Sequence, residues 1–180
     1  MALKNEIVAC ICEGAFERIV MEVLLDADCL EFSWCDLLEG DLVDLRNARR
    51  FTERYLHRDY GETHIRIIRI LDSRSERFDI PEFFQGKISR IQSYFTRPEI
   101  EILVIIHEAC YDEYTKKYAK MKPSVYCKSI LAYPNVKRAH FVQKYFNGVE
   151  KLIYALKRYK ELRGHTELCI YDLLKESIKR

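Results

Sequence analysis

Two acidic residues, Glu13 and Asp72, each follow directly on an apolar segment, residues 7–12 in one case and 64–71 in the other. If these segments form neighbouring parallel strands, both carboxylates lie at the same edge of a sheet, where open α/β folds keep their ligand crevice. Carboxylate oxygens are the ligands that Mg²⁺ and Mn²⁺ prefer. A metal ion there would orient water and neutralise developing charge in phosphoryl transfer. The alternative for Glu13 is a charge near a helix N-terminus, which the helix dipole favours.

The segment around Glu13 has the pattern of a strand, a turn and a helix. Residues 7–12 are apolar on both alternating faces, which is typical of a strand in the middle of a sheet that is covered on both sides. Across Gly14 the apolar period changes to that of an amphipathic helix. A strand followed at once by a helix predicts an α/β domain. The apolar positions of this helix are Phe16, Ile19, Val20, Val23 and Leu24.

The remaining elements are predicted from caps, glycine breaks and periodicity. Asp41 is the expected N-cap of a helix that ends near residue 57, and residues 86–95 suit a helix that runs into a short strand. The β-branched composition of residues 97–108 favours a strand, Pro98 at a first helical position favours a helix, and periodicity does not decide between them. Further helices are expected over residues 111–119, 124–131, 139–146, 149–162 and 166–178.

The composition is that of an ordinary globular protein of 180 residues, with a net charge of +2. No apolar run approaches the roughly 20 residues of a membrane helix, and no signal peptide is expected. Seven cysteines without a CxxC pair argue against a disulfide framework or a zinc ribbon, so a cytoplasmic location is expected. The sequence has no GxxxxGK[ST] loop, GxSxG elbow or HExxH motif, which excludes the enzyme classes that those motifs define.

Charge is distributed unevenly along the chain. Residues 19–45 contain eight acids and no base, whereas residues 137–163 contain eight bases and two acids. Lys157, Arg158 and Lys160 are therefore candidate contacts to nucleic acid. The basic region is equally consistent with a solvated helix face, or with docking to the acidic region, to a protein partner or to a second copy in a homodimer. No membrane partner is expected.

Three short blocks of the sequence carry a family resemblance. Residues 12–14 together with Glu17 form a CEG-x-x-E motif, Asp72 ends an apolar segment, and residues 97–107 read RPEIEILVIIH. These blocks resemble the RloB-like branch of the TOPRIM-related proteins, whose third block is NP-x-F-E-L-W-L-L-L-H. The positions that match in the third block are Pro98, Glu101 and His107.

The resemblance implies a mostly parallel sheet between helices, with Mg²⁺ held by a strand-end Glu and a later Asp-x-Asp for cutting or joining nucleic acid. By position, Glu13 would be the catalytic and metal-binding Glu, and Asp72 would be the first Asp. The second Asp is replaced by Arg74, which removes a ligand and adds positive charge beside the cation. Glu76 would supply a replacement ligand if the loop folds back.

Glu17, Glu101 and His107 are the candidate supporting residues of such a site. Glu101 has a second interpretation as a dipole partner in the first turn of a helix. His107 has a second interpretation as a core or boundary histidine with one hydrogen bond.

These observations predict a TOPRIM-like α/β domain over residues 1–118 and a helical extension over residues 119–180 that packs on it as one compact unit. The predicted function is that of a nuclease dependent on Mg²⁺ or Mn²⁺, of the kind found in bacterial phage defence. The alternative is a catalytically inactive relative that binds nucleic acid or a protein partner.

Overall fold

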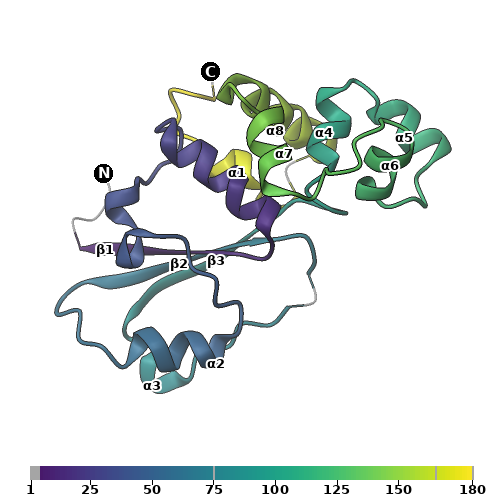
Figure 1. Cartoon of the computed structure of the whole chain (residues 1–180). Coiled ribbons are helices and arrows are strands. Elements are labelled where there is room, and N and C mark those ends of the chain that lie inside the picture. The colour runs from purple at the N-terminus through teal and green to yellow at the C-terminus, as the bar shows by residue number, and fades with distance from the viewer. Residues whose placement is uncertain (1–4, 75, 165, 180) are drawn as a thin grey trace.

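A computed structural model describes residues 5–74, 76–164 and 166–179, and its centre is a three-stranded parallel sheet (Figure 1). The strands are β1 (Glu6–Cys12), β2 (His64–Leu71) and β3 (Ile88–Phe95), in the order β1-β2-β3. Cys12 is the partner of Ile70 in the β1–β2 register, so the two strands end side by side. The protein is a mixed α/β fold with a small parallel sheet flanked by helices.

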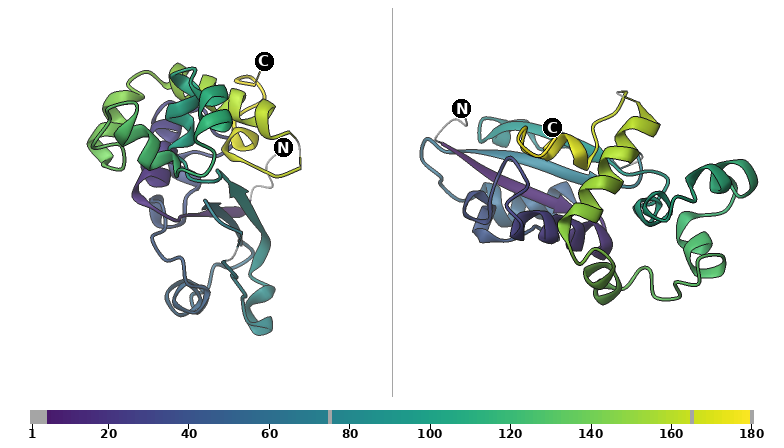
Figure 2. Two further views of the ribbon diagram at one scale, coloured as in Figure 1. Left: turned by 90° about the vertical axis from the view of Figure 1, so that its right-hand side faces the viewer. Right: turned by 90° about the horizontal axis from the view of Figure 1, so that it is seen from above.

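Helices cover both faces of this sheet (Figure 1). On one side lie α2 (Ala48–Phe51), which continues as a π-helical segment (Thr52–Leu56), and α3 (Glu82–Gln85). The other helices are α1 (Ala15–Asp26), α4 (Ile102–His107), α5 (Tyr111–Lys117), α6 (Pro123–Ser129), α7 (Ala139–Tyr145) and α8 (Val149–Arg163). Seen from above, α5 and α6 extend beyond the end of the sheet (Figure 2).

Alternate strand residues face two separate apolar cores, as the two-residue period of a strand requires. One core contains Cys10 and Ile68 together with residues of α1, α4 and α6 to α8. The other contains Ile11 and Ile67 and is closed by Phe51 of α2 and by the π-helical segment. The C-terminal helices therefore pack into the same core as the sheet.

Helix α1 follows the predicted pattern, because Phe16, Ile19 and Leu24 are buried and Val23 lies half-buried against the same core. The ambiguous residues 97–108 form a helix, α4, from Ile102 onward. All five residues 102–106 are buried, since α4 packs between α6, α8 and the core. Burial on every side explains why their periodicity was uninformative.

The prediction that residues 7–12 lie in the middle of the sheet is wrong. β2 is the central strand, and β1 is an edge strand of the sheet. Two single residues of the long loop between α1 and α2 bridge its outer side: Leu37 lies opposite Val8, and Val43 lies opposite Ile11. These contacts and the two cores explain why an edge strand is apolar on both faces.

The predicted N-cap at Asp41 is also wrong. The helix begins at Ala48, where the side chain of Asn47 accepts a hydrogen bond from the backbone N–H of Arg50 at 3.1 Å. Asp41 instead accepts a bond from Arg18 of α1 at 2.7 Å. Val43 bridges Ile11 of β1, and its backbone N–H donates to the carbonyl oxygen of Cys10 at 2.8 Å, which prevents an earlier helix start.

Two further predictions of secondary structure fail for tertiary reasons. Residues 88–95 are a strand along their whole length, because β3 pairs with β2. Within residues 166–178, the regular element that the structure describes is one 3-10 helix, Ile170–Leu173. Leu174 then bridges Leu30, and residues 176–178 form only a turn, in which the N–H of Ile178 donates to the carbonyl oxygen of Lys175 at 2.9 Å. Among the described residues, no helix is long and apolar enough to cross a membrane.

Replacement of the buried Leu24 in α1 tests how much α1 stabilises this core. We expect Leu24→Ala to lower the free energy of unfolding by about 2–5 kcal/mol, because the side chain is 0% exposed and its loss leaves a cavity. Leu162→Ala, at a residue that is 37% exposed, is the matched control and should cost less than about 1 kcal/mol. Urea denaturation measures both, and equal losses would contradict the described packing of α1.

Candidate active site

The loops that follow β1 and β2 bring Glu13 and Asp72 together. The backbone N–H of Glu13 continues the strand pairing by donating to the carbonyl oxygen of Ile70 at 3.1 Å. The backbone N–H of Asp72 donates to Oε2 of Glu13 at 2.8 Å. The two acids therefore meet at the carboxyl edge of parallel neighbouring strands, as the sequence predicts.

Both residues line a cavity of about 240 Å³ that is rich in carboxylates. Its walls come from the two strand-end loops, the first turn of α1, the loop before α2, the segment before α4 and the loop before α7. We call this space the acidic cavity. The charged residues that line it are Glu13, Glu17, Asp72, Glu99, Glu101, Arg46 and Lys137.

Glu17 and Glu101 are buried, at 6% and 3% exposure. Burial, together with the negative charges of Glu101, Asp72 and Glu13, raises the pKa of Glu17 to about 7. Burial also raises the pKa of Glu101, which lies at the N-cap position of α4. The cavity thus concentrates more negative charge than its surroundings offset.

Gly14 leaves room for the Glu17 carboxylate. A Cβ atom at this position would lie 2.7 Å from Oε2 of Glu17, well inside van der Waals contact. This close approach gives a physical reason for the Gly-x-x-Glu spacing, since a larger residue would displace the carboxylate.

Glu13 is held in place by several neighbours. Burial raises its pKa, as do the charges of Asp72 and Glu76, while the hydrogen bond from the Asp72 backbone acts in the opposite direction. Arg46 donates to the carbonyl oxygen of Glu13 at 2.8 Å and lies 3.6 Å from its Oε1. Both carboxylate oxygens therefore have a partner within the protein.

Glu99 and Lys137 form the opposite wall of the acidic cavity. Lys137 Nζ lies 3.4 Å from Glu99 and 3.6 Å from Glu101. Oε2 of Glu99 accepts a bond from the backbone N–H of Ser124, at the start of α6, at 2.9 Å. Burial acts to raise the pKa of Glu99, but the bonds from Ser124 and the charge of Lys137 outweigh it and lower the pKa. Glu99 thus anchors α6 as an ionised group.

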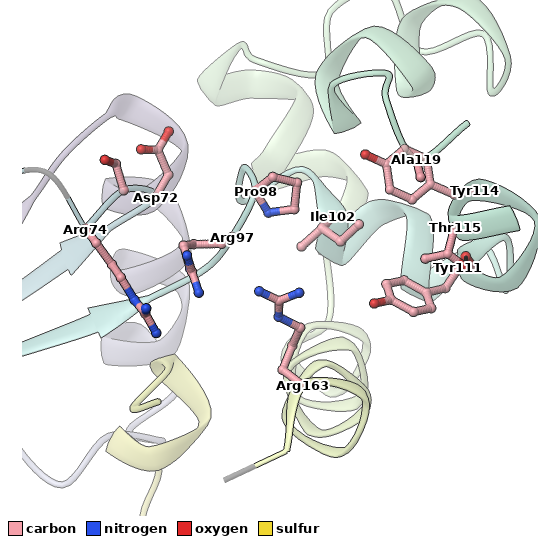
Figure 3. A pocket seen from close by; sticks show the side chains of 11 residues that line it. Asp72, Arg74, Arg97, Pro98, Ile102, Tyr111, Tyr114, Thr115, Ala119 and Arg163 are labelled. Atoms are coloured by element: carbon pink, nitrogen blue, oxygen red, sulfur yellow. Dashed lines mark hydrogen bonds between the residues drawn. The ribbon is translucent and has the colours of Figure 1, made fainter. Parts of the chain in front are cut away.

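Arg74 does not line the acidic cavity. Its side chain extends away from the Asp72 carboxylate (Figure 3) and pairs with Glu167, to which Arg97 also binds at 2.7 Å. The positive charge of Arg74 is therefore directed to a surface other than the acidic cavity.

Glu76 is near this site but is held by cations. Its Oε2 lies 3.3 Å from Arg69 and its Oε1 lies 4.0 Å from Arg46. It does not line the acidic cavity. Its negative charge nevertheless contributes to the raised pKa of Glu13.

His107 lies outside the acidic cavity, at the end of α4. Its Nδ1 lies 2.7 Å from the hydroxyl of Tyr145, which in turn donates to Glu108 at 2.6 Å. The ring also packs edge-on against Tyr145 and Phe146. These contacts are those of a boundary histidine that links α4 to α7.

The three predicted nucleic-acid contacts of α8 do not share one surface. Lys157 and Arg158 are exposed, and Arg158 pairs with Glu161. Lys160 is buried, with its Nζ 2.8 Å from Asp172. The helix thus presents two of these cations to solvent and uses the third to hold the C-terminal segment.

Sequence reasoning missed Arg46, Lys137 and Glu99 as residues of the site. Arg46 and Lys137 lie in loops without apolar periodicity, so no local pattern marks them.

In the part of the chain that the structure describes, no group of three or more His, Cys, Asp or Glu side chains is already arranged around one metal position. Comparison with protein-family models, curated proteins and solved structures finds no match to this chain.

The raised pKa of Glu17 predicts a pH-dependent stability. Because its pKa rises from 4.5 to about 7 on folding, the folded state binds a proton that the unfolded state releases, and stability falls as pH rises through this window. Glu17→Gln mimics the protonated form, so the variant should match wild type near pH 4.5. By about pH 8 it should be more stable by about 3 kcal/mol.

Denaturant unfolding of both proteins across this pH range checks the expectation. Glu53→Gln, at an exposed residue of the π-helical segment, controls for the loss of a carboxylate as such. A constant difference between wild type and Glu17→Gln would contradict the described environment of Glu17.

Proposed function

We propose that this protein is a TOPRIM-related, RloB-like nuclease that uses Mg²⁺ or Mn²⁺ to act on nucleic acid. One observation carries the proposal: Glu13, Glu17, Asp72 and Glu101 converge on one cavity at the carboxyl edge of two parallel strands. Buried acids that are not fully offset destabilise a fold. Their concentration at the ligand-binding edge of an α/β sheet therefore supports a functional site. A role in bacterial phage defence in the cytoplasm is part of the proposal by resemblance.

The donor set suits a hard divalent cation. All the acids of the cavity offer carboxylate oxygens, and burial, together with the negative charges of the neighbouring acids, raises the pKa of Glu17 to about 7. Glu13 and Asp72 would hold the ion, and this number agrees with the one or two protein carboxylates that Mg²⁺ usually takes. A bound ion would supply a Lewis acid for a phosphodiester.

The remaining residues of the cavity have positioning roles in this proposal. The bond from the Asp72 backbone orients the Glu13 carboxylate. Arg46 and Lys137 are exposed cations at the rim, where they can contact phosphate oxygens. Because Arg74 stands in place of a second strand-end acid, the site favours chemistry with one ion rather than two.

A second function, a non-catalytic module that binds nucleic acid or a protein partner, is supported by the contacts of Glu13. One of its oxygens accepts the Asp72 N–H and the other lies 3.6 Å from Arg46, so both are already engaged. In this alternative the acids are held within the protein and the cations act as the binding surface.

Cleavage assays distinguish the two functions. Glu13→Gln and Asp72→Asn keep the shape of the side chain and remove its charge, so cleavage should fall by about 100-fold or more with the fold intact. Wild type and variants are incubated with single- and double-stranded DNA and RNA, with Mg²⁺, Mn²⁺ or EDTA. Glu53→Gln is the matched control and should cut like wild type. Equal, metal-independent cutting by all proteins, or none by any beside tight binding, would contradict the nuclease proposal.

Metal binding is also measurable without a substrate. A ligand that binds only the folded state stabilises it by about 2.7 kcal/mol at a hundredfold excess over its dissociation constant. We therefore expect Mg²⁺ or Mn²⁺ to raise the melting temperature of wild type and of Glu53→Gln. Glu13→Gln and Asp72→Asn should lose most of this rise, because each lacks one carboxylate. The same rise in all four proteins would place the ion elsewhere.

A further inference from the structure

A second cavity of about 500 Å³ adjoins the acidic cavity and shares Asp72 with it. We call it the arginine groove, because three arginines contribute to its walls (Figure 3). Its floor and far wall come from the segment before α4, from α4 itself and from α5. The residues that matter for its chemistry are Arg74, Arg97, Arg163, Tyr111 and Tyr114.

The arginines approach this groove from three separate parts of the chain. Arg74 follows β2, Arg97 follows β3, and both are fixed by pairing with Glu167. Arg163 is exposed at the end of α8, and its guanidinium points from this helix toward the other residues that line the groove (Figure 3). Within the described ranges, no carboxylate lies within 4.0 Å of Arg163. The groove thus combines two anchored guanidinium groups with one that faces it without an acidic partner.

The aromatic wall has one buried ring, Tyr114, and one ring, Tyr111, that packs against the core but is partly exposed. Tyr114 is buried, its hydroxyl donates to the carbonyl oxygen of Met121 at 2.6 Å, and its ring packs against Tyr126. Tyr111 is half-buried at the groove, and none of the ring–ring contacts described for this structure involves it. A ring of this kind suits stacking by a planar group.

The positive surface continues beyond the groove. Ala119 lines both the arginine groove and a neighbouring hollow on the surface of α5 and the loop after it. That hollow is lined by Lys116, Lys117 and Lys120, all exposed. Cations therefore line two adjoining hollows, with Lys117 paired to Glu113 at 3.1 Å, and such a series suits a linear polyanion.

We propose that the arginine groove binds a single-stranded segment of nucleic acid and leads its phosphodiester backbone to Asp72. The arginines contact phosphates, and an unpaired base stacks on Tyr111. Stacking of this kind needs a base that is free of a partner strand, which favours a single strand over a duplex. The inference names the substrate class of the proposed nuclease and rests on that proposed function for the bond that is cut.

Binding in EDTA tests the groove separately from cleavage. The probes are labelled oligothymidylate and oligouridylate of about 12 nucleotides and a duplex of the same length, followed by fluorescence anisotropy. Arg163→Glu should weaken binding of the single strands about tenfold or more and reduce the salt dependence, because a phosphate contact is lost. Tyr111→Ala should weaken it about fivefold or more, whereas Tyr111→Phe, which keeps the ring, should bind like wild type. Arg49→Glu, on the far side of the sheet in α2, is the charge-matched control.

Each outcome decides between the proposals. Equal binding by Arg163→Glu, Tyr111→Ala and wild type, or equal weakening by Arg49→Glu, overturns the groove. Tighter binding of the duplex than of both single strands also overturns it. Because the assay contains no metal ion, loss of binding in the Arg163 and Tyr111 variants supports the groove even if the chain cuts nothing. Conversely, metal-dependent cutting that both variants retain would support the nuclease and overturn the groove.

Discussion

The parallel pairing of β1 with β2 is the constraint on which the site depends. Because Cys12 lies opposite Ile70, the next residue of each loop emerges at the same edge of the sheet. The bond from the Asp72 N–H to Oε2 of Glu13 then links the two loops directly. An antiparallel arrangement of the same strands would put the two acids at opposite ends of the sheet. The long connection over residues 13–63 returns the chain to the start of the sheet, so that β2 runs parallel to β1.

This arrangement conflicts with stability, and the conflict is itself informative. Glu17 and Glu101 are buried near Glu13 and Asp72, and the cations that line the same cavity are Arg46 and Lys137. A buried carboxylate that is not offset either costs several kcal/mol or takes up a proton. Because the pKa of Glu17 is about 7, this carboxylate can take up a proton at neutral pH. Purely structural acids would more often be placed as Glu99 is, with a backbone N–H and a lysine as partners.

The sequence predicted those parts of the fold that local patterns specify. β1, β2 and α1 were predictable because their apolar periods are unambiguous. The proximity of Glu13 and Asp72 was predictable too, because each acid directly follows one of the two strands. The edge position of β1 and the full length of β3, of which the sequence indicated only a short part, were not predictable, because strand pairing joins distant segments of the chain. The same holds for the direction of Arg74, which depends on Glu167, 93 residues further along the chain.

The shared position of Asp72 gives the arginine at residue 74 a consistent interpretation. A guanidinium beside the acidic cavity would repel a cation there, but the pairing of Arg74 with Glu167 carries its charge into the arginine groove. Asp72 thus lies at the boundary between a wall of carboxylates and a wall of guanidinium groups. The arginines would neutralise the non-bridging oxygens of a phosphodiester bound there. The carboxylates of the acidic cavity would lie on the other side of the same phosphodiester. In the proposed function Arg74 would supply a phosphate contact beside the acidic cavity and no metal ligand within it, so binding of nucleic acid and metal-dependent cleavage would be separable properties of neighbouring walls.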